Sequence, residues 1–164
     1  MPTRQINVRR FSITSSKPFG AVVASIESAV DHPGMSEFAR AMSAPSTYAE
    51  MEGFLLKALA KTGFMEFARY DPGAVLRKEL GPGAPRIVRF VIGNPLIMKE
   101  MAKHVPDVGS YAPVNILVDE RPDGVHLSYD EMASLLAPYE NEEALKVARN
   151  LDAKIEKLLT DAAA

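Results

Sequence analysis

The segment "GVHLSYD", Gly124 to Asp130, carries the densest set of side chains that could do chemistry. Side chains alternate between the two faces of a strand, so His126, Ser128 and Asp130 share one face and the apolar residues between them share the other. Neighbours on one face lie roughly 7 Å apart, too far for a serine to contact a histidine base directly. The row is therefore no hydrolase triad. It allows His126 to act as a general acid or base while Ser128 and Asp130 position a substrate.

A second strand-like segment, "PVNILVDE", precedes this one and is joined to it by "RPDG". Two alternating runs around a short turn predict an antiparallel hairpin. In the usual register Asn115 stands beside the polar row of the second strand, so it joins the candidate ligand-binding residues. The alternative interpretation is the solvated polar face of a two-sided sheet.

The stretch "VIGNPL" is built like a phosphate-binding turn, since a strand runs through Gly-Asn-Pro into a helix. Free N–H groups at a helix start attract anions, which makes Asn94 a candidate ligand contact. No P-loop lysine and no further glycines follow, however. Each residue also has a structural role: Gly93 relaxes the backbone, Asn94 caps the helix and Pro95 presets its first dihedral angle. The sequence favours the structural interpretation.

The remaining candidates are histidines and tyrosines. His32, His104 and His126 fall in different predicted elements, so no pair has the spacing of helical metal ligands, and no metal site is predicted. His32 or His104 could ligate a haem, with methionine-rich apolar surface against its ring. Tyr111 is a candidate ligand contact at a pocket mouth, with Tyr139 nearby, because tyrosine combines an apolar body with a polar tip.

Composition limits the classes of protein that fit. The 164 residues include no cysteine, which excludes thiol catalysis, disulfides and zinc–thiolate sites. A formal charge of -2 argues against nucleic-acid binding, which needs a positive surface. No run of about 18 apolar residues and no signal peptide is found, so we expect no membrane span and a cytoplasmic location.

Periodicity predicts the elements that must position these residues. Period-two patterns and β-branched or aromatic content predict strands, and apolar stripes at spacings of three and four predict helices. The expected strands are 6–14 (with a bulge at the arginine pair), 63–70, 86–92, 113–120 and 124–130. The expected helices are 16–30, two within 35–61 separated by "SAPS", 71–80 (capped by Asp71), 95–104 and 141–160. Thr47 and Glu50 have capping-box spacing at the start of the second helix within 35–61, and Asn141 caps the last helix.

We therefore expect one α+β domain over residues 1–164, a curved antiparallel sheet with helices packed on one face. Its core spans about residues 63–160, and residues 5–31 complete the sheet and supply the first helix. A helical insertion lies near residues 32–62. The final helix buries a stripe that includes Leu151.

Three stretches together, "RFVIGNPLIMKEM", "YAPVNILVDERPDGVHLSYD" and "NEEALKVARNLDAKIEKLL", resemble the bacterial and archaeal family called domain of unknown function 302. The resemblance covers about residues 63–160. It implies a fold similar to one half of the TATA-binding protein and a tendency to form dimers. Shorter members lack the helical insertion. The fold similarity does not imply DNA binding, since fold does not carry function.

The sequence thus favours a dimeric, non-enzymatic or sensory module that binds a small, partly apolar ligand between its sheet and the inserted helices. The first alternative is an enzyme that uses His126 as general acid or base with Asn115, Ser128 and Asp130. The second is a haem or metal protein that relies on His32 or His104. The sequence identifies no cofactor.

Overall fold

Alternating apolar and polar residues in five segments form one antiparallel sheet with the strand order β1-β5-β4-β3-β2. The computed structural model describes residues 3–44 and 47–164. The strands are β1 (Arg10–Ser15), β2 (Met65–Tyr70), β3 (Ile87–Gly93), β4 (Val114–Arg121) and β5 (Gly124–Asp130). The hairpin of β4 and β5 is present, as the sequence predicts, and both of its strands lie inside the sheet.

The described helices also follow the predicted periodicity, except for a short one at Met132–Leu136 that was not predicted. They are α1 (Phe19–Ala29), α2 (Met35–Ser43), α3 (Tyr48–Ala58), α4 (Gly73–Leu80), α5 (Pro95–Ala102), α6 (Met132–Leu136) and α7 (Glu142–Ala163). Two 3-10 turns, η1 (Pro106–Ser110) and η2 (Ala137–Tyr139), complete the described elements. The predicted "SAPS" linker between α2 and α3 includes residues 45 and 46, which lie outside the described residues.

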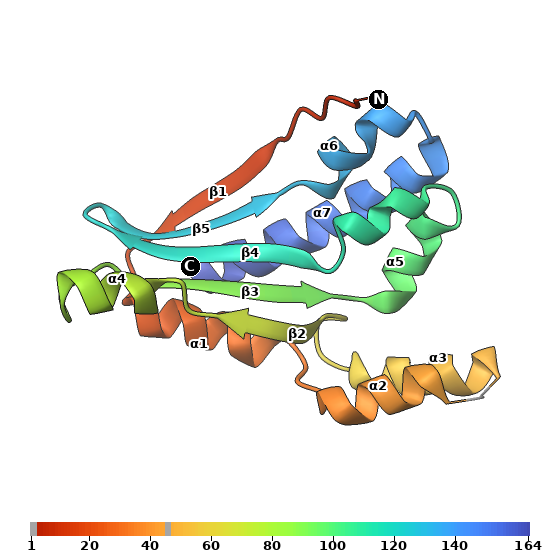
Figure 1. Cartoon of the computed structure of the whole chain (residues 1–164), viewed down its shortest axis with the longest axis horizontal. Helices are drawn as coiled ribbons and strands as arrows, with labels where there is room; N and C mark the ends of the chain where they lie inside the picture. The colour runs from red at the N-terminus through yellow and green to blue at the C-terminus, as the bar shows by residue number, and fades with distance from the viewer. Residues whose placement is uncertain (1–2, 45–46) are drawn as a thin grey trace.

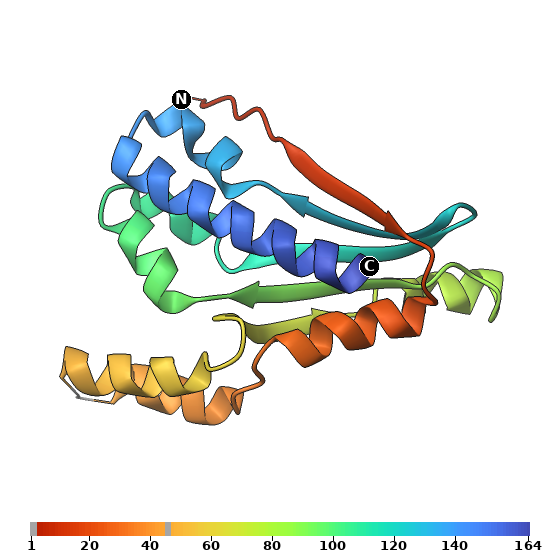
Figure 2. The same ribbon diagram turned by 180° about the vertical axis from the view of Figure 1, so that it is seen from behind.

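The molecule has two layers. In Figure 1 the strands lie in front of α1 and α7, and Figure 2 shows the same two helices in front of the sheet. The inward side chains of β1, β3, β4 and β5 and the stripe of α7 form the main core, in which Ile116, Leu127, Ala148 and Ile155 are fully buried. The opposite face of the sheet is the polar one, which is the arrangement expected of a two-layer α+β fold.

Helices α2 and α3 extend from one end of the sheet (Figure 1). They lie in the segment 32–62 that the sequence predicts to be an insertion, a status that stays a prediction; it is called the insertion below. The capping box predicted at the start of α3 is present, with Thr47 and Glu50 bonded reciprocally. A second, smaller core joins the insertion to the sheet through Leu55, Leu59 and Met65. The insertion is therefore anchored by apolar contacts of its own.

Two details of the prediction are wrong. The first strand begins at Arg10 rather than at residue 6, and it pairs with β5 without a bulge. Val8 is about half exposed, and the Arg9 amide donates to the Ser134 hydroxyl instead of to a strand. Asp71 does not cap α4 either: Pro72 is the N-cap, and the Asp71 carboxylate pairs with Arg77.

Candidate functional site

An apolar pocket of about 250 Å³ opens where α2 meets the end of the sheet. Its walls come from α2, β2, α5, the segment before β4, and α7. Among the described residues, Asn94 is the one polar residue in the lining. The lining residues are Phe38, Met42, Phe67, Gly93, Asn94, Pro95, Ile97, Met98, Met101, Ala112, Pro113, Val114 and Leu151. We call this the apolar pocket.

The Gly-Asn-Pro turn forms the floor of the apolar pocket. The Asn94 side-chain oxygen accepts hydrogen bonds from the Leu96 and Ile97 amides at 2.8 and 3.2 Å, and its amide group donates to the Gly63 carbonyl at 2.9 Å. These bonds are those of a helix N-cap. The side chain is occupied by the protein's own backbone, which supports the structural interpretation of the turn.

Gly93 allows the walls of the apolar pocket to approach each other. A Cβ atom at this position would lie 3.1 Å from the Pro113 Cβ and 3.4 Å from a ring carbon of Phe67. A side chain at this position would require Pro113 to shift by a few tenths of an ångström, whereas Phe67 would be in ordinary contact. The glycine thus serves close packing at the pocket floor, and its φ is not in the positive region that would make glycine necessary for the turn.

Helix α2 contributes one wall through two residues four positions apart, Phe38 and Met42, which lie on one helical face. The Phe38 ring meets Phe67 of β2 edge to face, with 5.5 Å between the ring centroids. No residue of α2 is fully buried. The helix is therefore held to the sheet mainly along the pocket wall.

The polar row predicted on β5 lies on the face of the sheet that no helix covers. Asn115, Ser128 and Asp130 line one hollow of about 160 Å³ together with Arg10 and Arg89. We call this the sheet-face hollow. Arg10 and Asp130 form a two-pronged ion pair at 2.6 and 2.9 Å. Three of the predicted ligand-binding residues thus share one hollow, but their role stays a prediction.

His126 lies on the same face of β5, two residues before Ser128, and it does not line the sheet-face hollow. Its Nε2 atom lies 2.8 Å from Asp123 Oδ1, and its Nδ1 atom lies 3.4 Å from the Thr14 hydroxyl. The hydrogen bond to His126 holds the pKa of the Asp123 carboxyl below its usual value. Both ring nitrogens have neighbours within the protein, so the geometry gives the enzyme hypothesis no added support, and it stays a prediction.

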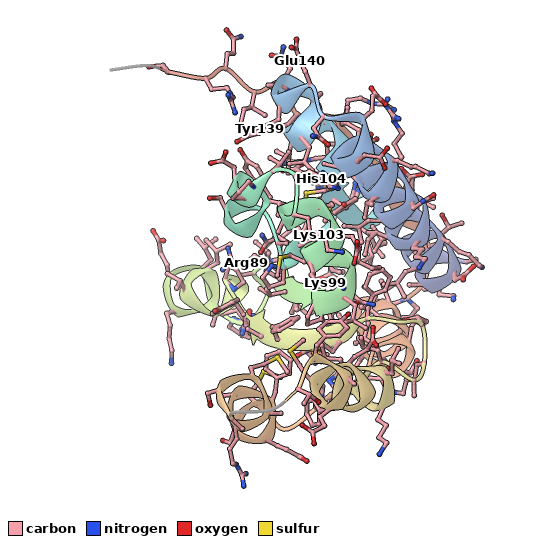
Figure 3. The ribbon with its side chains drawn as sticks, turned by 90° about the vertical axis from the view of Figure 1, so that its right-hand side faces the viewer. Arg89, Lys99, Lys103, His104, Tyr139 and Glu140 are labelled. Atoms are coloured by element: carbon pink, nitrogen blue, oxygen red, sulfur yellow. The ribbon has the colours of Figure 1, made fainter. Side chains whose placement is uncertain are left out.

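The other two histidines lie outside the apolar pocket. His32 lies 2.8 Å from the Glu27 carbonyl and 3.7 Å from the Glu66 carboxylate. His104 follows α5 near Lys103 and Lys99 (Figure 3) and is exposed. Within residues 3–44 and 47–164, no three histidine, aspartate or glutamate side chains are grouped to hold a metal ion. Neither histidine lines the apolar pocket, so the haem hypothesis stays a prediction.

Tyr111 and Tyr139 meet at their hydroxyl groups, 3.1 Å apart. The guanidinium of Arg4 lies over the Tyr139 ring, 4.1 Å from its centre. The hydrogen bond with Tyr139, which favours the neutral hydroxyl of Tyr111, and partial burial raise the pKa of Tyr111 to about 12. The pair joins the segment after η1 to η2 and does not line the apolar pocket, so ligand binding by Tyr111 stays a prediction.

The sequence analysis did not identify some residues that line the apolar pocket and the sheet-face hollow. Phe38 and Phe67 lie in predicted elements, but no motif marks them as pocket residues, because α2 and β2 meet only in the folded chain. Arg89 was missed because it sits in a nearly continuous apolar run. The signal that could have found it is a lone charge in such a strand, since that charge must face away from the core.

The comparisons place the chain in a family without giving it a function. The profile of the family described as "Domain of unknown function DUF302" matches residues 40–162. The chain belongs to this family. A solved structure, the crystal structure of an uncharacterized conserved DUF302 protein from Bacillus stearothermophilus, is similar over 93% of this chain and 97% of that chain, with a TM-score of 0.66 and 11% identity. No match was found among curated proteins.

The match extends further toward the N-terminus than the sequence resemblance, since it begins at residue 40 within α2. At 11% identity the solved structure supports the fold alone. None of the matches tests the likeness to the TATA-binding protein, which stays a prediction. In the described residues no helix is long and apolar enough to span a membrane.

Proposed function

We propose that this protein binds a small apolar molecule, of one to three fused rings or similar size, in the apolar pocket. One observation carries the proposal: a cavity of about 250 Å³ is lined by apolar side chains, and the one polar residue in that lining is engaged by backbone groups. Such a cavity offers a ligand dispersion contacts and removal from water but little directional hydrogen bonding.

The size of the apolar pocket supports this ligand class. A dry apolar cavity of roughly 150 Å³ holds benzene, whereas sites for drug-sized molecules start at roughly 300 Å³. A volume of about 250 Å³ lies between the two. The ligand is therefore larger than a single ring and smaller than most cofactors.

The side chains of the apolar pocket favour an aromatic ligand over a saturated one. Met42, Met98 and Met101 supply polarizable thioethers that adapt to a ligand's shape and make favourable contacts with aromatic rings. Phe38 and Phe67 supply two ring surfaces already set edge to face. We expect naphthalene-like compounds to bind more tightly than linear alcohols of equal size.

Fluorescence titration with 1-aminoanthracene, which brightens in apolar surroundings, tests the proposal. Met42→Trp places a larger side chain in the apolar pocket and is expected to weaken probe binding at least about tenfold. Met35→Trp makes the same change on the same helix at an exposed position outside the lining. This control is expected to shift the affinity less than about twofold.

Equal affinities in the two variants would show that the probe binds elsewhere, and the proposal would fail. We expect naphthalene to displace the probe and n-octanol not to displace it. The reverse order would replace the aromatic class with an aliphatic one. The predicted homodimer and the predicted cytoplasmic location remain separate proposals; light scattering during size-exclusion chromatography measures the first.

A further inference from the structure

We infer that the uncovered face of the sheet carries a second binding site, for a short carboxylic acid, built on Arg89 in the sheet-face hollow. This site goes beyond the proposed function. It shares no lining residue with the apolar pocket. It also differs in chemistry, because it recognises a charge rather than apolar surface.

The strand register brings the side chains of the site together. Arg89 on β3 lies opposite Leu117 on β4, and Leu117 lies opposite Ser128 on β5. Asn115 is two residues from Leu117 along β4, so it points to the same face. Figure 3 shows Arg89 on the side of the sheet away from α7.

Arg89 is a positive charge of the sheet face that the described residues leave without an ion-pair partner. In the described part of the chain its guanidinium has no carboxylate within salt-bridge distance, and it lies over the Tyr70 ring at 4.6 Å. By contrast, Arg10, Arg86 and Arg121, which lie on or beside the neighbouring strands, are each paired with an acidic side chain. Stacking on an aromatic ring holds the guanidinium in place and leaves its N–H groups for a ligand.

The other polar groups of the hollow complete a set of donors. Within the described residues, Asn115 and Ser128 have no side-chain hydrogen bond to the protein, and Ser128 is only 9% exposed. The Ser128 residue is thus largely enclosed, unlike the free side chains of a solvated sheet face, while its hydroxyl still reaches the solvent. With Arg10 and Asp130 cancelling each other, the hollow keeps one net positive charge.

This arrangement selects a carboxylate over other anions. A guanidinium fork matches the two oxygens of a flat carboxylate, and one net positive charge balances one negative charge. Leu117 forms a half-buried apolar floor between Arg89 and Ser128, which suits a short carbon chain. A volume of about 160 Å³ limits the ligand to a few carbon atoms. A phosphate dianion carries two negative charges instead of one, and it has no carbon chain to pack against Leu117.

Amide chemical-shift titration with sodium butyrate tests this inference. The ionic strength is held constant because screening alters surface attraction. Titration to ~50 mM detects dissociation constants on the order of 10 mM. Shifts are expected at residues 89, 115, 117 and 128, with phosphate and sulfate binding more weakly than butyrate.

Arg89→Gln is expected to weaken butyrate binding at least about tenfold, because the bidentate charged contact is lost. Arg89→Lys keeps the charge without the fork and is expected to give an intermediate loss. The control Arg121→Gln removes an equal charge from β4 outside the hollow and is expected to change the affinity less than about twofold. Since Arg89 is exposed, these variants are expected to fold.

Three results would overturn the inference. The first is an absence of shifts at residues 89, 115 and 128 in the unmodified protein. The second is equal weakening by Arg89→Gln and Arg121→Gln, which would show general charge attraction. The third is phosphate or sulfate binding as tightly as butyrate, which would show an adventitious anion site without carboxylate selectivity.

Discussion

The buried carboxylate of Asp152 on α7 joins β5 and α6 to its own helix by three hydrogen bonds. Its oxygens accept from the Tyr129 hydroxyl at 2.7 Å and from the Met132 and Ala133 amides at 2.7 and 3.0 Å. The residue is 5% exposed on α7. It therefore satisfies the first N–H groups of α6, which no side chain of α6 itself caps.

Asp152→Asn is expected to lower the free energy of unfolding by about 1–3 kcal/mol, because the amide turns one acceptor into a buried donor that faces another donor. Urea unfolding measures the change. Asp161→Asn, on the exposed face of the same helix, serves as control and is expected to stay within about 0.5 kcal/mol of the unmodified protein. Equal small effects for both would contradict a structural role for Asp152.

The raised pKa of Tyr111 predicts how stability depends on alkaline pH. The folded-state pKa of about 12 exceeds the unfolded value near 10. Its contribution to stability is therefore present below about pH 10 and is lost as the pH rises toward 12. In Tyr111→Phe we expect a shallower fall of the free energy of unfolding over this range. Urea unfolding at several pH values measures it, and parallel curves for the two proteins would refute the shift.

At the scale of residues, the prediction succeeded where the alternation of side chains along a strand decides which residues share a face. The polar residues of β5 share a face because the period of a strand is two. Their partners could not be predicted: Thr14 and Arg10 come from β1, more than a hundred residues away in the sequence. Asp152 was noticed only as part of a family resemblance, since a helix pattern alone does not show which carboxylate is buried.

At the scale of elements, the cap of α5 decides whether the Gly-Asn-Pro turn is structural. Asn94→Ala is expected to lower the free energy of unfolding by about 1–3 kcal/mol, through loss of the cap and of the bond to Gly63. Asn94→Ser keeps a capping oxygen, so a smaller loss is expected. Thermal or urea unfolding distinguishes them. If Asn94→Ala changes ligand binding but not stability, the turn is a ligand site after all.

Helix α7 provides a second test at this scale. Leu151 is 4% exposed and also lines the apolar pocket. Leu151→Ala is expected to cost about 2–5 kcal/mol of unfolding free energy, because it removes buried volume. Arg149→Ala, on the exposed side of the same helix, is the control. A loss under about 0.5 kcal/mol for Leu151→Ala would place the predicted stripe on the wrong face.

The prediction of helices and strands worked best where the apolar periodicity agrees with the capping and turn residues at the ends of an element. The hairpin of β4 and β5, the capping box of α3 and the cap of α7 by Asn141 were all expected and are all present. The errors lie where residue types were compatible with two structures. Ile6 and Val8 have strand-like spacing, but they lie beyond the last residue of β5 that β1 can pair with. Asp71 could cap α4, but Arg77 is in reach and competes for its carboxylate.

At the scale of the molecule, the two-layer sheet leaves an apolar pocket at one end and a polar hollow on the open face. The position of neither site could be predicted from the sequence. The apolar pocket requires the insertion to return to the end of β2, which depends on a small separate core around Leu55 and Met65. The sequence did suggest a ligand between sheet and insertion, because an added helical segment must cover something apolar.

Ligand binding in the apolar pocket is expected to stabilise the whole molecule. A ligand present at 100 times its dissociation constant adds about 2.7 kcal/mol to the free energy of unfolding if it does not bind the unfolded chain. Naphthalene near saturation is expected to raise the melting temperature of the unmodified protein and of Met35→Trp. No rise is expected for Met42→Trp. A similar rise in all three proteins would indicate binding outside the apolar pocket.

The most direct test is a crystal structure of the protein with 1-aminoanthracene bound. We predict ring density between α2 and α5, in contact with Phe38, Met98 and Pro113, while the Asn94 hydrogen bonds remain as they are. Density elsewhere, or a pocket closed by its own methionine side chains with no probe inside, would contradict the proposal that this site binds small apolar molecules.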